Sequence, residues 1–228
     1  VLNGQNHQLP LNDGNNHLHG GDGGFDRALW RVEEWDPKGD SLTLHYDSQD
    51  GVVGYSGMPT VTATYSLLAD GIMIRYLSPT AADPIVHLAN HSYFNLAGQG
   101  AGKVDEHFIK IMADSYTVSD EELIPTGEIA DVTDTPYDFR QGKTIGQGIE
   151  EGKSFAPMQL PCYNGGYDTN FVLQNDGALV VAAEVYEPKS GRVMEVLTDQ
   201  PGIQLYTGNM MNEEAGKDGR KYGPREGF

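Results

Sequence analysis

Short runs of alternating apolar and polar residues recur along the chain. Ser41–Tyr46 alternates clearly, and Val61–Leu67 places threonine on the face opposite to its apolar residues. Ile72–Leu77 follows an Asp70-Gly71 turn, a pair typical of hairpins. A period of two indicates half-buried strands, because successive side chains of a strand point to opposite faces. The pattern therefore predicts three strands here, the last two joined as a hairpin.

Later runs of the same kind extend this prediction. They lie at residues 107–112, 170–173, 179–186, 193–198 and 203–206, and Asn3-Gly4 predicts a further hairpin near the start. No convincing amphipathic helix of ten residues or more is present. Strands with long loops favour antiparallel sheets, as a β-sandwich rather than a barrel. Without a repeat or linker to mark a boundary, we expect one domain over residues 1–228.

The composition is typical of a turn-rich globular protein. Of its 228 residues, 29 are glycine, 12 are proline and 21% are charged. The 15 basic and 33 acidic residues give a net charge of −18, which argues against nucleic acid and anionic membranes as partners. A single cysteine, Cys162, excludes an intramolecular disulfide and fits a reducing compartment, so we expect a cytoplasmic protein. Oligomeric state is not indicated.

One polar cluster surrounds a histidine within an otherwise apolar segment. An imidazole there could donate a proton near neutral pH. A core histidine with satisfied hydrogen bonds is the structural alternative. We expect this segment to be buried, which argues against glycosylation of its Asn-x-Ser sequon. The cluster reads Asn90-His91-Ser92-Tyr93-Phe94-Asn95-Leu96.

A second cluster, Asn16-His17-Leu18-His19-Gly20-Gly21, lies upstream. In an extended segment His17 and His19 would share one face, and with Asp22 they could bind a metal ion. A third ligand of suitable spacing is missing, so we expect no metal. A turn histidine bonded to the backbone is an alternative, as is a ligand site in which glycines allow a polar substrate to approach.

A third cluster, Gly165-Gly166-Tyr167-Asp168, precedes a predicted strand. Asp168 stands at the entrance of that strand, where capping of a turn is the structural reading. A carboxylate at this point could instead bind two sugar hydroxyls.

Together these clusters resemble the aldose 1-epimerase, or galactose mutarotase, family. The matches occur in order over nearly the whole chain, and their joint specificity is high although no single motif would suffice. They comprise the three clusters, Gly24-Phe25-Asp26 with Trp30, Pro125-Thr126-Gly127, Thr135-Pro136-Tyr137-Asp138-Phe139-Arg140, and Pro201-Gly202-Ile203-Gln204-Leu205-Tyr206-Thr207-Gly208-Asn209.

The resemblance implies an all-β, mutarotase-like β-supersandwich of antiparallel sheets that interconverts the α and β anomers of a free aldohexose, galactose or glucose. His91 resembles the general acid that protonates the ring oxygen, and His19 the second catalytic histidine, which hydrogen-bonds the sugar. Asp168, Gln204 and Asn16 resemble residues that bind the substrate. No metal or organic cofactor is implied.

The same resemblance leads us to expect a chain incomplete at both ends. The family's general base is a glutamate just beyond a Gly-Phe step, whereas this chain stops at Phe228 and Glu226 is out of register. The family's Asn-Arg pair would precede Val1. The chain is therefore expected to be part of an active mutarotase, or else a non-catalytic, sugar-binding relative. Enzymes for phosphorylated hexoses would need a basic phosphate cradle, which the scattered arginines do not form.

Overall fold

The structure is a computed structural model that describes residues 6–36, 38–47, 60–79, 86–159 and 163–228. Two compact units, Val1–Asn90 and His91–Phe228, divide the chain, and each is described by itself. The Asn3-Gly4 hairpin and Cys162 lie outside the described residues. Within them, no helix has the length and apolar character needed to span a membrane.

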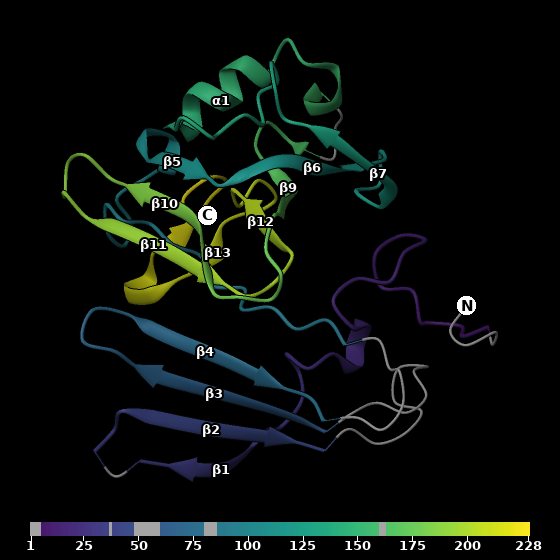
Figure 1. Ribbon diagram of the computed structural model, residues 1–228, viewed down its shortest axis with the longest axis vertical. Helices are drawn as coiled ribbons and strands as arrows, with labels where there is room; N and C mark the ends of the chain where they lie inside the picture. Colours follow the sequence, from purple (N-terminus) through teal and green to yellow (C-terminus); the bar gives the residue numbers. More distant parts are fainter. Residues whose placement is uncertain (1–5, 37, 48–59, 80–85, 160–162) are drawn as a thin grey trace. The chain divides into compact units, whose positions relative to one another are not determined.

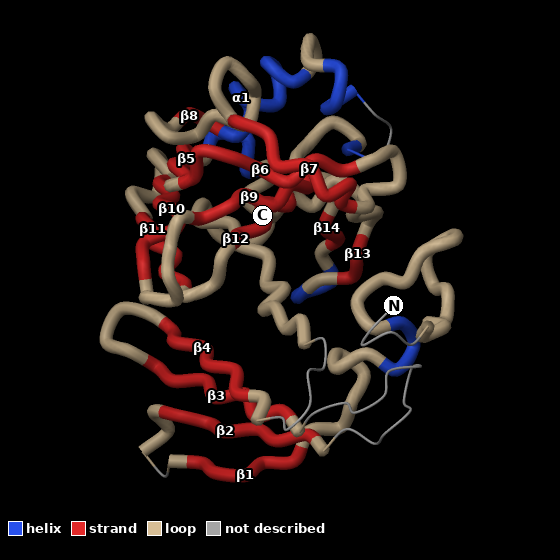
Figure 2. The backbone as a smooth tube through the Cα atoms, turned by 45° about the vertical axis from the view of Figure 1, so that its right-hand side comes forward, coloured by secondary structure: helices blue, strands red, loops and turns tan. Residues whose placement is uncertain are grey.

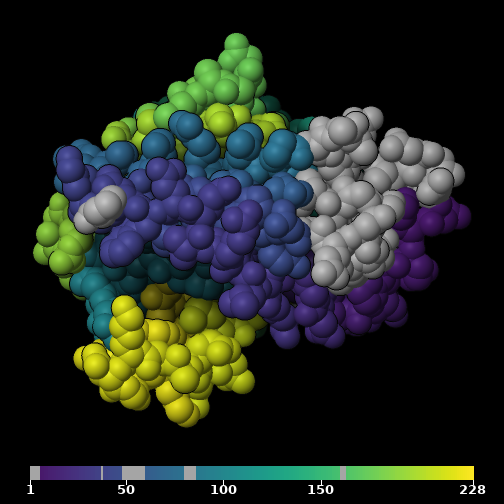
Figure 3. Space-filling model, turned by 90° about the horizontal axis from the view of Figure 1, so that it is seen from below, coloured from purple at the N-terminus to yellow at the C-terminus, as the bar shows by residue number. Residues whose placement is uncertain are grey.

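The first unit contains one four-stranded antiparallel sheet with the strands in chain order (Figure 1). The strands are β1 (Arg31–Trp35), β2 (Ser41–Tyr46), β3 (Val61–Leu67) and β4 (Ile72–Leu77). The three strands predicted from alternation are confirmed with the predicted bounds. The sequence pattern missed β1, because all five of its residues are exposed and an exposed edge strand needs no alternation. Figure 3 shows the described atoms of this unit in purple to blue, seen from below.

The second unit contains two four-stranded antiparallel sheets and a small hairpin (Figure 2). One sheet has the order β11-β10-β5-β8, and the other has the order β12-β9-β6-β7. The strands are β5 (Phe108–Ile111), β6 (Ala113–Ser119), β7 (Pro125–Asp131), β8 (Lys143–Thr144), β9 (Asp168–Leu173), β10 (Val180–Tyr186), β11 (Val193–Thr198) and β12 (Gly202–Tyr206), with β13 (Glu214–Ala215) and β14 (Lys221–Tyr222) as the hairpin.

Apolar residues from both sheets of the second unit form one core. Ile109 and Val185 come from the first sheet, and Phe171 and Leu205 from the second. Shared burial by two antiparallel sheets is the arrangement of a β-sandwich. The predicted all-β class is therefore confirmed, and β5, β9, β10, β11 and β12 lie within two residues of their predicted bounds. The sequence pattern did not predict β6, β7, β8, β13 or β14.

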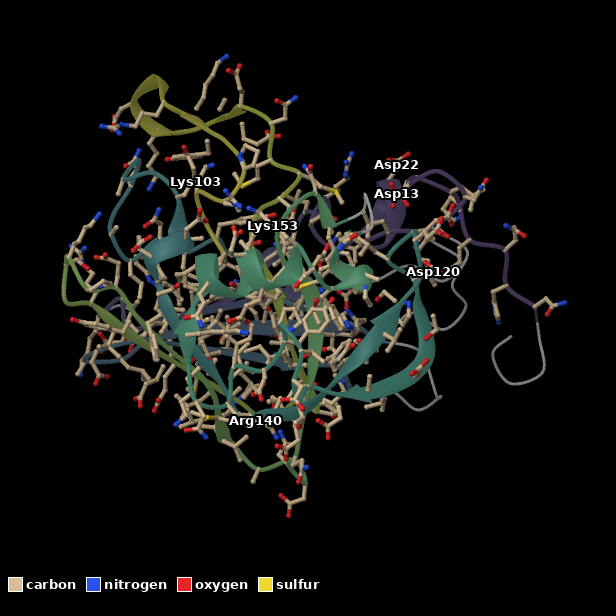
Figure 4. The ribbon with its side chains drawn as sticks, turned by 90° about the horizontal axis from the view of Figure 1, so that it is seen from above. Asp13, Asp22, Lys103, Asp120, Arg140 and Lys153 are labelled. Atoms are coloured by element: carbon tan, nitrogen blue, oxygen red, sulfur yellow. The ribbon has the colours of Figure 1, made fainter. Side chains whose placement is uncertain are left out.

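One α-helix, α1 (Ile145–Gly152), adds to this core (Figure 4, viewed from above with Lys153 just after the helix). Thr144 caps it, because its hydroxyl accepts a hydrogen bond from the Gln147 amide at 3.1 Å. Ile145 and Ile149 are buried, one turn apart. The eight-residue helix offers only this pair as an apolar stripe, too little for a periodicity argument to detect.

A buried polar network joins the start of β9 to the end of β12. The Tyr167 amide donates to Thr207 Oγ1 at 2.9 Å, and Asn209 Nδ2 donates to the Tyr167 carbonyl at 2.7 Å. Thr207 Oγ1 also donates to Asn209 Oδ1. Thr207 and Asn209 are 0% and 1% exposed, so each hydrogen bond satisfies a group that water cannot reach. A side chain on Gly166 would collide with this network, since its Cβ would lie 1.8 Å from Asn209 Oδ1.

We expect Gly166→Ala to lower the free energy of unfolding by about 1–3 kcal/mol, because the added methyl group must displace buried hydrogen-bonded atoms. Chemical denaturation measures this loss. Gly223→Ala is the matched control, because a Cβ on Gly223 meets nothing within 4 Å. Equal stability of the two variants would contradict the packing argument.

Candidate functional site

Asp168 and Gln204 lie side by side on the face of their sheet that points away from the core. Asp168 begins β9, as the sequence predicts, and pairs with Tyr206 across the ladder to β12. Gln204 is two residues before Tyr206, so its side chain shares that face. Gln204 Nε2 donates a hydrogen bond of 2.7 Å to Asp168 Oδ1. A carboxylate and a carboxamide, two groups that bind hydroxyls, therefore stand together.

The residues that alternate with them face inward. Thr169, Phe171 and Leu205 are all at most 5% exposed. Thr169, the neighbour of Asp168 on β9, therefore lies on the core face and leaves the outward face to Asp168 and Gln204.

Three aromatic rings gather beside this pair. The His91 ring lies 5.2 Å from that of Tyr93 and 6.3 Å from that of Tyr206, centroid to centroid, and the two tyrosine rings lie 6.0 Å apart. Tyr206 thus contacts His91 through its ring and Asp168 through strand pairing. The structure brings together three of the predicted site residues, His91, Asp168 and Gln204.

Both tyrosines of this group remain protonated well above neutral pH. Burial raises the pKa of Tyr93, and the charges of Tyr206, Asp168 and Glu214 add to the effect. Burial and the Asp168 carboxylate likewise raise the pKa of Tyr206, although its hydrogen bond from the Met210 amide opposes them. The phenols therefore contribute neutral surface and hydrogen-bonding hydroxyls to the group.

The segment around His91 is not buried, contrary to the sequence prediction. Asn90, His91 and Ser92 are exposed, and Tyr93 and Phe94 are each 44% exposed. Residues 86–95 belong to no strand or helix, so no sheet ladder encloses this segment. The apolar composition was a poor guide because composition does not say whether another part of the chain covers a segment. Burial consequently gives no argument against glycosylation of Asn90.

Asn16 lies in a closed loop of the first unit, and His19 directly follows this loop. Asn12 closes it, because its carboxamide bonds both the amide and the carbonyl of Leu18, at 2.8 and 3.0 Å. The Asn16 amide donates to the Asp13 carbonyl at 2.8 Å. His17 Nδ1 lies 2.7 Å from the Pro10 carbonyl oxygen, which confirms the backbone-bonded turn histidine for this residue.

This loop is not extended, so the basis of the His17–His19 metal site fails. His19 has a φ of 50°, in the left-handed region, which breaks the alternation that would place both rings on one face. Among the described residues, no group of three metal-ligating side chains is found. Gly24 also has a local packing role, since a Cβ there would lie 2.5 Å from the His19 carbonyl oxygen.

Arg140, one of the scattered arginines and labelled in Figure 4, forms ion pairs with two carboxylates. Its Nε and Nη2 donate to Asp138 at 2.9 and 2.8 Å, and Nη1 donates to Asp114 at 3.2 Å. This guanidinium stabilises the Asp138 turn. Its charge is offset there, which weakens the phosphate-binding alternative.

Sequence reasoning did not select Tyr206 as part of the site. Tyr206 lies directly opposite Asp168 because of the β9–β12 register, and alternation alone does not give a register. Sequence reasoning also did not single out His107, which served only as the first residue of a predicted strand. The strand begins at Phe108, and His107 is a buried side chain beneath Leu96.

Comparison with known proteins agrees with this fold and these motifs. The sequence matches the Aldose 1-epimerase family over residues 1–228. It is 39% identical over 231 residues to the galactose mutarotase of Sus scrofa and 31% identical over 230 residues to the aldose 1-epimerase of Escherichia coli, covering 100% of this chain in each case. The chain spans 63% of the length of the first of these relatives and 64% of the second.

Two solved structures share the fold. A GalM/aldose epimerase homologue from C. elegans superimposes with a TM-score of 0.84 at 25% identity, over 100% of this chain and 66% of that one. The galactose 1-epimerase of Lactobacillus acidophilus gives a TM-score of 0.74 at 30% identity, over 97% and 62%. These likenesses confirm the predicted mutarotase-like fold, and with the match along its whole length the chain belongs to the aldose 1-epimerase family.

Proposed function

We propose that the protein to which this chain belongs interconverts the α and β anomers of a free aldohexose, galactose or glucose. Family membership and the names of the relatives support this reaction. The observation that carries the proposal is the 2.7 Å hydrogen bond between Gln204 and Asp168, on the face where Tyr206 contacts the His91 ring. Hydroxyl-binding groups and an imidazole thus occur together.

The chemistry requires an acid and a base on opposite sides of the hemiacetal. A base removes the proton from the C1 hydroxyl, C1 becomes an aldehyde carbon, and the bond from C1 to the ring oxygen breaks. An acid protonates the ring oxygen as it leaves. Rotation about C1–C2 and closure from the other face give the second anomer.

We assign His91 to the acid role, and Asp168 and Gln204 to the binding of sugar hydroxyls. A carboxylate accepts hydrogen bonds from hydroxyls, and a carboxamide both donates and accepts. His19 and Asn16 are proposed as further sugar contacts on the family resemblance alone. No described residue is proposed as the base. The mechanism calls for no metal ion or organic cofactor.

Two further proposals accompany this function. Residues 1–228 are proposed to act as one mutarotase-like domain. The cytoplasm is the proposed compartment, on the basis of the single cysteine in the sequence.

The reaction is tested by anomer-resolved NMR of freshly dissolved α-galactose and α-glucose. The natural protein, with any residues that flank this chain, is expected to bring the anomers to equilibrium faster than buffer alone. A rate equal to that of buffer, together with sugar-dependent shifts of histidine signals, would support a binding protein and contradict the enzyme.

We expect His91→Asn to lower kcat by about 10²–10⁴-fold, the usual contribution of a general acid, with a much smaller effect on KM. The proton is transferred only in the transition state, so ground-state binding is largely retained. Polarimetry under saturating sugar gives kcat. His87→Asn, at another exposed histidine, is the control. An unchanged kcat for His91→Asn would remove this residue from the acid role.

Asp168→Ala is expected to weaken sugar binding by about 10- to 100-fold, because it removes charge-assisted hydrogen bonds to the hydroxyls. Isothermal titration calorimetry or KM measures the change. Asp176→Ala, in the exposed turn after β9, removes the same charge at another place and should bind sugar normally. Comparable affinity for both variants would exclude Asp168 as a sugar-binding residue.

A further inference from the structure

His107 lies directly beneath the segment that carries His91. It ends the short 3-10 helix Val104–Glu106 and precedes β5, and its side chain is 1% exposed. Its Nε2 accepts a hydrogen bond of 2.9 Å from the Leu96 amide. A ring nitrogen that accepts cannot carry a proton, so the neutral ring has its proton on Nδ1. This contact therefore fixes the tautomer of His107.

The surroundings of His107 favour this neutral ring. Burial lowers its pKa, and the Glu187 charge and the Val104 backbone carbonyl partly oppose the effect. The Phe228 ring meets the imidazole edge to face, 5.6 Å away between centroids. The form that can accept the Leu96 amide is thus the form that predominates near neutral pH.

The carbonyl of Leu96 is held from the other side. Ser190 Oγ donates to it at 3.0 Å and Arg192 Nη1 at 2.8 Å. Both belong to the turn between β10 and β11, which is built around a Glu187 side chain that is 1% exposed. The Glu187 carboxylate accepts the amides of Lys189 and Ser190, at 3.1 and 2.6 Å.

Two more contacts fix the residues just before Leu96. Phe94 and Phe228 exchange backbone hydrogen bonds of 2.8 and 3.1 Å. Asn95 Nδ2 donates to the carbonyls of Gly102 and Glu226, at 2.8 and 3.0 Å. The segment has no sheet ladder, so such individual contacts determine where it runs. His91, at its other end, meets Tyr93 and Tyr206 through its ring.

We propose that His107 is a positioning residue for His91. It holds the Leu96 amide while Ser190 and Arg192 hold the Leu96 carbonyl, so that the peptide groups on both sides of Leu96 are fixed. These two peptide groups set the course of the segment on which the imidazole of His91 meets Tyr93 and Tyr206. The inference rests on the proposed function only in assigning an effect on turnover; the positioning itself does not depend on it.

The test compares His107→Gln with His107→Leu in the natural protein. The glutamine carboxamide oxygen can accept the Leu96 amide, whereas leucine cannot. We expect His107→Leu to lower kcat by about 10- to 100-fold, the effect of a small misplacement of a catalytic group, with a much smaller change in KM. His107→Gln should recover kcat to within a few-fold of the wild type.

Ile109→Val is the control for a general weakening of the core. Ile109 lies two residues after His107, is 3% exposed and faces the same core. Its aliphatic side chain cannot form a hydrogen bond with Leu96. The variant should retain kcat. Full activity of His107→Leu, or equal losses in the folded leucine and glutamine variants, would overturn the proposal.

Histidine NMR supplies a readout that needs neither activity nor a stable leucine variant. In the ¹⁵N-labelled wild type, His107 should show a protonated Nδ1 and an accepting Nε2; the opposite tautomer would overturn the proposal. The His91 ring signals should move in His107→Leu and not in His107→Gln. A wild type that leaves anomer exchange at the buffer rate would refute the proposed function, while these signals would still decide the role of His107.

Discussion

The pairing of β9 with β12 is the constraint on which the candidate site depends. Its register sets Asp168 opposite Tyr206 and brings Gln204 within hydrogen-bonding distance of the carboxylate. The buried contacts of Thr207 and Asn209 with Tyr167 fix this register at the end of the ladder. Because side chains alternate along a strand, the same register that places polar groups outward also places Phe171 and Leu205 in the core.

His91 is placed by different means. Its segment is irregular, so the periodic hydrogen bonds of a sheet do not determine its course. Contacts from His107 just before β5, from the β10–β11 turn and from the end of the chain converge instead on residues 94–96. The outward face of the ladder and the separately anchored segment together form the group of polar and aromatic side chains in the second unit.

Much of the fold could be predicted from the sequence where a strand alternates regularly. Alternation located β2, β3 and β4 with their bounds, and it failed for β1 and β7, which are almost wholly exposed. It also failed for β6, whose pairing register shifts interrupt the alternation although its residues Ala113 and Tyr116 are buried. Asp168 could be predicted because two glycines and the start of a strand mark its position. His91 and Gln204 were indicated by their own motifs, which resemble those of the family.

The parts of the site that the sequence did not reveal depend on tertiary contacts. Tyr206 belongs to the group only through the register of β12 on β9. His107 has no informative neighbours in sequence, and its importance follows from a contact with Leu96, eleven residues away. The expectation that His91 is enclosed was wrong because apolar composition does not say which segment packs over which.

The alternation on β9 and β12 has a consequence for how this protein can change over time. A substitution at Asp168, Gln204 or Tyr206 alters only the outward face, so the side chains of the proposed sugar site can change while the interior stays packed. An insertion or deletion of one residue in either strand would exchange the two faces, putting a carboxylate into the core and an aromatic ring into water. We therefore expect lineages to diversify here by exchanging side chains, with strand length held constant.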